Sequence, residues 1–202
     1  MTEPNGAIFT DHLNFFDCSK VSDGASAIAI VSEEGLARIG LIPSDAVEIV
    51  AFAQVEEDLT KPPLELTEMT TTKVAVQKAL ENAGITIDQI STIETHDCFS
   101  IAGILAIEAI GLAEAGKGPQ FVLDGHSSRN GKIPFNTTGG LIGWGHPTGA
   151  TGVHMAVTIW EQLTGRAGAA QITISDSKPY ALSINMGGDD KNLVVIVYKK
   201  VS

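Results

Sequence analysis

The stretch GWGHPTGATG, residues 143–152, is the densest group of glycines in the chain. It leads into an apolar segment, residues 150–163, whose length and end at Gly165 predict a helix. Grouped glycines ahead of a helix indicate tight backbone turns around a site. His146 lies between a glycine and a proline in this turn, so its side chain has little freedom. Taken alone, this His is as consistent with an ordinary turn residue as with a general base or an oxyanion donor.

Two other turns follow predicted strands. The first reads His96-Asp97-Cys98-Phe99, and the second reads Asn185-Met186-Gly187-Gly188. Sites in open α/β sheets form beyond the carboxyl ends of strands, where these turns are expected to meet. Cys98 lies at a predicted helix start two residues after His96, which favours a thiolate, although a small buried residue is an equal alternative. Gly187 is expected either to offer its N–H to a developing charge or to be a plain hairpin glycine.

Apolar runs and glycine stops predict the order of elements. Strands are expected at 47–55, 91–95, 133–136, 180–186 and 193–199, with helices at 70–83, 101–110 and 150–163. This order predicts an α/β fold, a mostly parallel five-stranded sheet with helices on both faces. An apolar strand at 25–31 and a short helix from Ser32 to about Gly40 precede that unit and are left over.

Composition limits the classes of function. The 202 residues carry 13 Lys and Arg against 24 Asp and Glu, a net charge of −11, which argues against nucleic acid as a partner. No run is long enough for a membrane helix, and residues 1–5 do not resemble a secretory signal. The two cysteines favour a reduced, soluble, intracellular protein, and the histidines show no metal-ligand spacing. The acidic runs 56–58 and 189–190 are expected to be solvated faces.

Taken together, these motifs resemble the C-terminal half of a thiolase, in order and over most of the chain. Ser22-Asp23-Gly24-Ala25 resembles the strand entry N/S-D-G-A-A of that family, and residues 96–99 resemble the H-D-C-F motif of the sterol-carrier-protein type. Residues 139–152 resemble the signature G-G…G-H-P-x-G-A-[ST]-G. The resemblance implies that residues 1–44 are the end of an N-terminal domain and that residues 45–202 are a thiolase-like C-terminal domain.

The resemblance also implies roles. His146 would help to activate a nucleophile and would line an oxyanion hole, which His96 would complete. Cys98 would exchange the proton at the substrate α-carbon, and Gly187 would give an N–H to a second oxyanion hole. The turn at 185–187 replaces the C-x-G motif of other thiolases, and Phe99, Asn185 and Met186 are expected to line the substrate pocket. The substrate would be a coenzyme A thioester, with no further cofactor.

The nucleophilic Cys of a thiolase lies in its N-terminal half, which this chain lacks. The first hypothesis is therefore the C-terminal part of an acyl-CoA C-acyltransferase, inactive alone and completed by an N-terminal half on the same or a separate chain, in a homodimer or larger oligomer. The second is a non-catalytic thiolase-like module that binds acyl-CoA or a partner. A retro-aldol relative ranks third, because neither Tyr180 nor Tyr198 falls in a motif. Cytoplasm, mitochondrion and peroxisome are not distinguished.

Overall fold

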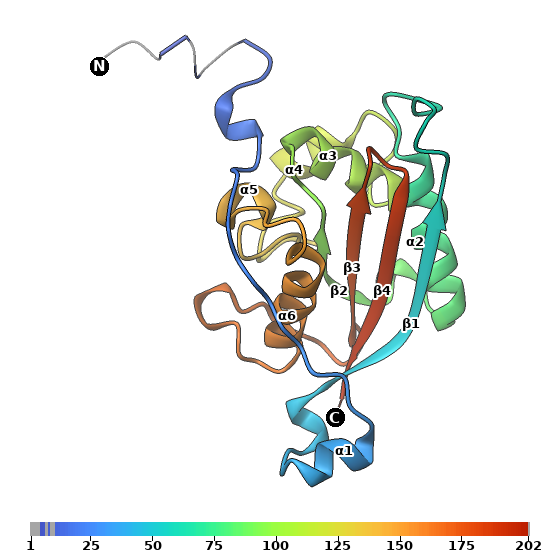
Figure 1. The fold of residues 1–202 in the computed structure, drawn as a ribbon, viewed down its shortest axis with the longest axis vertical. Helices are drawn as coiled ribbons and strands as arrows, with labels where there is room; N and C mark the ends of the chain where they lie inside the picture. Colours follow the sequence, from blue (N-terminus) through green and yellow to red (C-terminus); the bar gives the residue numbers. More distant parts are fainter. Residues whose placement is uncertain (1–4, 7, 9–10, 202) are drawn as a thin grey trace.

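The structure, a computed structural model, describes residues 5–6, 8 and 11–201, so the expectation for residues 1–5 lies almost wholly outside the described residues. One mixed sheet runs through the described part, with the strand order β1-β4-β3-β2. Strand β4 is antiparallel to both of its neighbours, and β2 is parallel to β3 (Figure 1). The strands are β1 (Val47–Glu56), β2 (Ile90–Thr95), β3 (Tyr180–Gly187) and β4 (Asn192–Lys200).

The α/β class is confirmed, but the expected five-stranded, mostly parallel sheet has four strands in the described residues and one parallel pair. The segment expected as a strand at 133–136 makes a single bridge, between Phe135 and Ile93. Its other backbone bonds return to its own loop, since Ile133 donates to His126 and Phe135 donates to Ser127. Strand β4 inserts between β1 and β3, which gives β1 an antiparallel neighbour.

Helices cover both faces of the sheet, as predicted. Helices α2 (Thr70–Ala83) and α3 (Ser100–Ala109) pack with one face, and α6 (Thr151–Leu163) packs on the other (Figure 1). The alternation of side chains along β3 separates the two cores, because Leu182 and Ile184 face α2 whereas Ala181 faces α6. The expected stop of α2 is confirmed at Gly84, which adopts the left-handed conformation that glycine tolerates.

The remaining helices are short. Helix α1 (Glu33–Arg38) is confirmed with its expected start, because Ser32 Oγ accepts a hydrogen bond from the Gly35 amide. Helices α4 (Gly118–Leu123) and α5 (Gly140–Trp144) were not predicted, since neither is long enough to show a period. Single 3₁₀ turns lie at Phe15–Asp17, Pro43–Asp45, Ile87–Gln89 and Gly168–Ala170. In the described residues, no helix is long and apolar enough to cross a membrane.

The N-terminal segment, residues 11–46, runs along the outside of the α/β unit and passes α5 and α6 (Figure 1). Residues 25–31, expected as a strand, pair with no strand in the part of the chain that is described. They are mostly exposed, and Ile30 keeps 76% of its surface accessible. An apolar strand needs neighbours on both sides. The pairing of 25–31 with another sheet, and the division of the chain at residue 44, therefore stay predictions.

Candidate active site

His96 directly follows β2, at the end of the parallel pair. Its amide donates to the Ile184 carbonyl over 3.0 Å, so the ladder with β3 continues through this residue. Its Nδ1 lies 3.2 Å from Asn185 Oδ1, at the end of β3. Burial, together with the nearby His146, lowers the pKa of the His96 imidazole below its usual value. The ring is therefore neutral at pH 7, with Nδ1 held by the Asn185 side chain.

His146 is held by the glycine-rich turn that the sequence singled out. Gly145 before it has a φ of 114°, and a side chain at 145 would lie 2.2 Å from Ser22 Oγ. The same Ser22 hydroxyl accepts a bond from the His146 amide over 3.3 Å. The turn that carries the imidazole is thus built from two sides, by its own glycine and by the N-terminal segment.

The His146 tautomer follows from its hydrogen bonds. Nδ1 lies 2.7 Å from Thr151 Oγ1, and the Thr151 hydroxyl donates in turn to the Pro147 carbonyl over 3.3 Å. We assign the ring proton to His146 Nδ1, because the Thr151 oxygen then accepts from it while the Thr151 hydroxyl donates to the Pro147 carbonyl. Burial lowers the pKa of His146, so the ring is neutral and its Nε2 holds a lone pair. A nitrogen in this state can accept a proton as a general base does and, once protonated, can donate an N–H to an oxyanion.

The structure brings two of the three predicted turns into direct contact. The rings of His96 and His146 meet edge to face, with centroids 4.8 Å apart and planes at 88°. Asn185 joins the third turn to them through its bond to His96. Within the described residues, no protein hydrogen bond engages the Nε2 atom of either ring. Two neutral imidazoles with free Nε2 atoms therefore lie side by side at the carboxyl ends of β2 and β3.

Cys98 is half-buried and keeps its proton more firmly than the sequence suggested. Helix α3 begins at Ser100, two residues beyond Cys98, so the thiol is outside the helix. Burial and the charge of Asp97 raise the pKa of Cys98. The expectation that a helix dipole and an imidazole favour the thiolate is therefore wrong in this structure. The Cys98 carbonyl accepts from the Ser19 amide over 2.8 Å. Phe99 forms an isolated antiparallel β-bridge with Cys18, and its side chain stays half-exposed.

Gly187 ends β3 in the hairpin to β4 and is exposed. A side chain built at Gly187 would meet nothing closer than 3.9 Å, so this part of the chain does not itself require glycine there. Met186 packs against the core beneath α2, whereas Asn185 bonds to His96. Lining of a substrate pocket by Phe99, Asn185 and Met186 stays a prediction.

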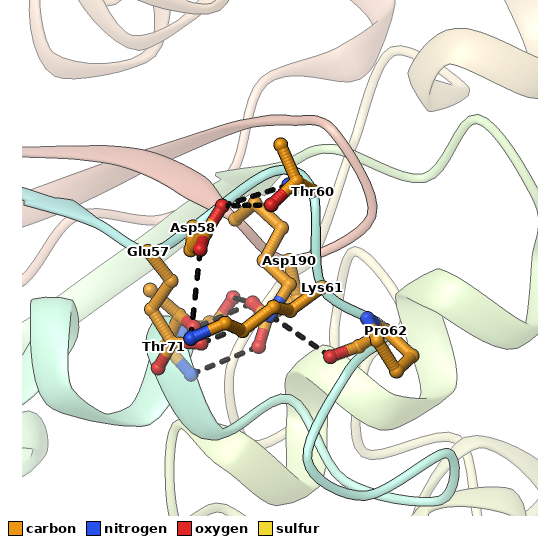
Figure 2. A network of polar contacts seen from close by, with 9 residues as sticks. Glu57, Asp58, Thr60, Lys61, Pro62, Thr71 and Asp190 are labelled. Atoms are coloured by element: carbon orange, nitrogen blue, oxygen red, sulfur yellow. Dashed lines mark hydrogen bonds and ion pairs between the residues drawn. The ribbon is translucent and has the colours of Figure 1, made fainter.

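The two acidic residues of this hairpin differ, which corrects the expectation of a solvated face. Asp190 is buried, and its carboxylate accepts from the amides of Thr71 and Thr72 and from the Thr72 hydroxyl, over 2.6–3.0 Å (Figure 2). Helix α2 has no side-chain cap at Met69, so Asp190 takes that place from 119 residues away. Asp189 stays exposed, as expected.

Lys191 is also buried and fastens the hairpin to the segment after β1. Its Nζ lies 3.0 Å from Glu57 Oε2 and donates to the Pro62 carbonyl over 3.3 Å. Figure 2 shows Asp58 after Glu57 in the same network, bonded to Thr60 and paired with Lys61. The acidic run 56–58 is therefore in part a partner of the Gly187 hairpin, and its Glu57 is engaged in an ion pair.

A cavity of about 480 Å³ lies apart from the paired imidazoles. It is lined by residues from Thr67 to Lys73 and from Leu105 to Ala115, and none of the predicted catalytic residues lines it. In the described ranges, no group of three or more His, Cys, Asp or Glu is placed to hold a metal ion. The candidate site is thus the cluster of side chains at the ends of β2 and β3, with His96 buried and His146 half-buried.

Comparison with known proteins identifies the class. The model of a family described as "Thiolase C-terminal domain-like" matches residues 54–200. The chain therefore belongs to the thiolase C-terminal domain-like family, and the resemblance drawn from its motifs is confirmed.

Two curated relatives and one solved structure show which members of the family this chain is similar to. The chain is 34% identical over 197 residues to the acetyl-CoA acetyltransferase of Methanothermobacter thermautotrophicus, covering 97% of this chain and 50% of that protein. It is 37% identical over 197 residues to sterol carrier protein 2 of Homo sapiens, covering 94% and 34%. A solved structure, the Ltp2-ChsH2(DUF35) aldolase, shares the fold with a TM-score of 0.75 at 19% identity, over 95% of this chain and 48% of that one. The chain spans half or less of the length of each.

Two residues that orient the site, and one buried acid in β2, were not assigned roles from the sequence. Ser22 and Thr151 lie inside quoted motifs, but only the fold shows that they bond to His146. Glu94, two residues before His96, is 3% exposed, and its Oε1 has no hydrogen-bond partner. Burial raises the pKa of Glu94 to about 8. A charged residue inside an otherwise uncharged strand was the available signal for Glu94.

Proposed function

We propose that this chain supplies the acid/base and oxyanion-stabilising half of a thiolase-type acyl-CoA C-acyltransferase, whose nucleophilic Cys comes from an N-terminal half. The observation that carries the proposal is the pair of neutral imidazoles in edge contact, with their Nδ1 atoms held and their Nε2 atoms free. The acyltransferase among the relatives supports the reaction class. The incomplete coverage of those relatives supports a second half.

In thiolysis, the cysteine thiol of the missing half would give its proton to His146 Nε2 and attack the 3-oxo carbon of the substrate. The bond between C2 and C3 then breaks, leaving an acyl-cysteine and the carbanion of a shorter acyl-CoA. Cys98, whose raised pKa keeps it protonated, would give its proton to that carbanion. The thiol of a second coenzyme A takes the acyl group from the enzyme and gives its proton to Cys98, while His146 returns its proton to the released cysteine. Condensation is the same sequence in reverse.

The test is a mixing experiment. The chain alone is expected to show no thiolysis of acetoacetyl-CoA, and activity should appear on addition of a separately produced thiolase N-terminal half. A His146→Ala variant should abolish that activity, and Cys98→Ser should block exchange of the acetyl-CoA α-protons with D₂O, followed by NMR. Thiolysis by the pure chain alone would contradict the proposal.

A non-catalytic module is the second candidate, favoured by the exposed apolar side chains of the N-terminal segment, among them Val21, Ile30 and Ile42. Such a module would bind acyl-CoA or a partner chain without turnover. The same mixing experiment separates the two functions. A stable complex with the added half that never turns over, while the same half is active with its own C-terminal domain, would favour the module.

A further inference from the structure

Asp97 is a member of the His96–Phe99 turn to which the proposed chemistry gives no role. Its side chain points to the other catalytic turn, because Asp97 Oδ1 accepts from the Leu141 amide over 2.7 Å. Leu141 belongs to α5, the helix that ends at Trp144, two residues before His146. The Asn136 side chain, which bonds to the Thr95 backbone, also lowers the pKa of the Asp97 carboxyl. Asp97 therefore connects the turn after β2 to the start of α5, the helix that precedes His146.

The surroundings of this carboxylate leave it little freedom. A side chain at Gly140 would lie 2.1 Å from Asp97 Oδ2, and Gly140 has a φ of 62°. On the other side, a Cβ at Gly103 in α3 would lie 3.4 Å from Asp97 Cβ. The carboxylate is thus seated between α3 and α5, at a position where Gly140 is needed for it to fit.

The charge of Asp97 also acts on the groups of the site. A negative charge favours the protonated form of a neighbouring group. The Asp97 carboxylate therefore opposes the lowering of the His146 pKa by burial, and it adds to burial in raising the pKa values of Cys98 and Glu94. Burial raises the pKa of Asp97 itself, whereas the Leu141 amide and the Asn136 side chain lower it. The hydrogen bond of Asp97 to Leu141 and the negative charge of Asp97 therefore act on different properties. A substitution that keeps the bond and removes the charge can separate the two.

We propose that Asp97 is a positioning residue, whose carboxylate holds α5 against the end of β2 and so sets the edge contact between the His96 and His146 rings. The positioning role concerns geometry and holds for the chain by itself; its effect on turnover rests on the proposed function. Loss of the Leu141 bond would release α5 from the end of β2, while the turn at 145–147 keeps its bonds to Ser22 and Thr151.

The test is NMR on the full chain, with the nuclear Overhauser contacts between the two rings as the readout. Asp97→Ala should lose these contacts and shift the Leu141 amide. Asp97→Asn should keep the contacts, because its amide oxygen still accepts from Leu141, and it should lower the pKa of His146 because the charge is gone. Ring contacts that persist in a folded Asp97→Ala chain would overturn the proposal, and so would their loss in Asp97→Asn.

A pair of glycine substitutions tests the same contact from the other side. Gly140→Ala places a methyl group on the carboxylate and should also separate the rings. Gly143→Ala lies in the same helix with open space around it and should not. If Asp97→Ala fails to fold, a pH titration of the Leu141 amide in the unaltered chain tests the proposal instead. Its chemical shift should follow the titration of Asp97, and a shift insensitive to that titration would overturn the proposal.

Activity of the assembled enzyme separates this proposal from the proposed function. Once the chain is joined to an N-terminal half, Asp97→Ala should lower kcat by roughly 100-fold with little change in KM, and Asp97→Asn should recover most of kcat. If the rings separate in Asp97→Ala but the unaltered assembly never turns over, the proposed function fails and the positioning role stands. Equal kcat values for all three chains would overturn the effect of positioning on turnover.

Discussion

The α/β unit, residues 47–200, and the N-terminal segment, residues 11–46, are held by different forces. The unit has a core of fully buried side chains such as Ile93, Ile159 and Leu182, whereas the segment buries one residue, Leu36, among those described. The segment is attached instead by polar contacts at the catalytic turns. Asp17 bonds to Ser100, Ser19 to Cys98, and Ser22 to His146. Stability is therefore concentrated in the unit, and the segment serves the geometry of the site.

The largest effect is expected from the core of the unit. Leu182→Ala removes a fully buried side chain from the centre of the sheet and should lower the free energy of unfolding by about 2–5 kcal/mol. Ile30→Ala, in the exposed part of the segment, should change it by less than about 0.5 kcal/mol. Urea unfolding followed by circular dichroism measures both. Equal costs would remove the contrast between the two regions.

The next effect belongs to the hairpin. Asp190→Asn takes away one of the two carboxylate acceptors at the start of α2 and should cost about 1–3 kcal/mol. Asp189→Asn is the matched control, since both positions have a positive φ that Asn tolerates and Asp189 is exposed. The control should stay within about 0.5 kcal/mol of the unaltered chain. A difference too small to measure between the two variants would show that α2 does not need this cap.

Glu94 should make the stability of the unit depend on pH. Its pKa in the folded chain, about 8, lies above the ordinary value of 4.5, so the folded state binds the extra proton between these values. Its contribution to stability is complete below pH 4.5 and is lost as the pH rises through about 8. Glu94→Gln should flatten that dependence and be more stable than the unaltered chain at pH 8. If the free energy of unfolding depended on pH in the same way in both chains, Glu94 would not be the group that binds the extra proton.

The smallest effect on stability is expected in the segment. Ser22→Ala removes a long hydrogen bond to the His146 amide and should cost less than about 1 kcal/mol. It should nevertheless shift the amide and ring resonances of His146 in an NMR spectrum. Ser26→Ala, in the same segment, is the control and should leave His146 unchanged. If the His146 resonances did not change in Ser22→Ala, the segment would not support the catalytic turn.

The same contrast explains what the sequence could predict. Helix α2, with its stop at Gly84, and strands β1, β3 and β4 were predicted because each depends on local period and turn residues. Residues 133–136 have a strand composition, but apart from one bridge to Ile93 their backbone bonds go to their own loop, which no local pattern records. Residues 25–31 form no strand in the described chain because strand formation needs a neighbour, not only a composition.

For the site, the motifs predicted His96 and His146 but not what orients them. Thr151 and His146 are five residues apart, yet their bond depends on the turn between them. Asp97 and Leu141 are separated by 44 residues, and Asp190 and Thr71 by 119. Contacts at such separations follow from the topology, so Asp190 was taken for a solvated acid when it caps a helix.

The long reach of Asp190 has a consequence for synthesis on the ribosome. Helix α2 leaves the exit tunnel well before the residue that caps it, and β1 must wait for β4, the last strand of the sheet, before it gains its neighbour. The nascent chain can therefore form α2 only with its first turn uncapped until Asp190 has left the ribosome. Premature termination a few codons before Asp190 would leave both β1 and the start of α2 unprotected, which makes such products ready substrates for proteolysis.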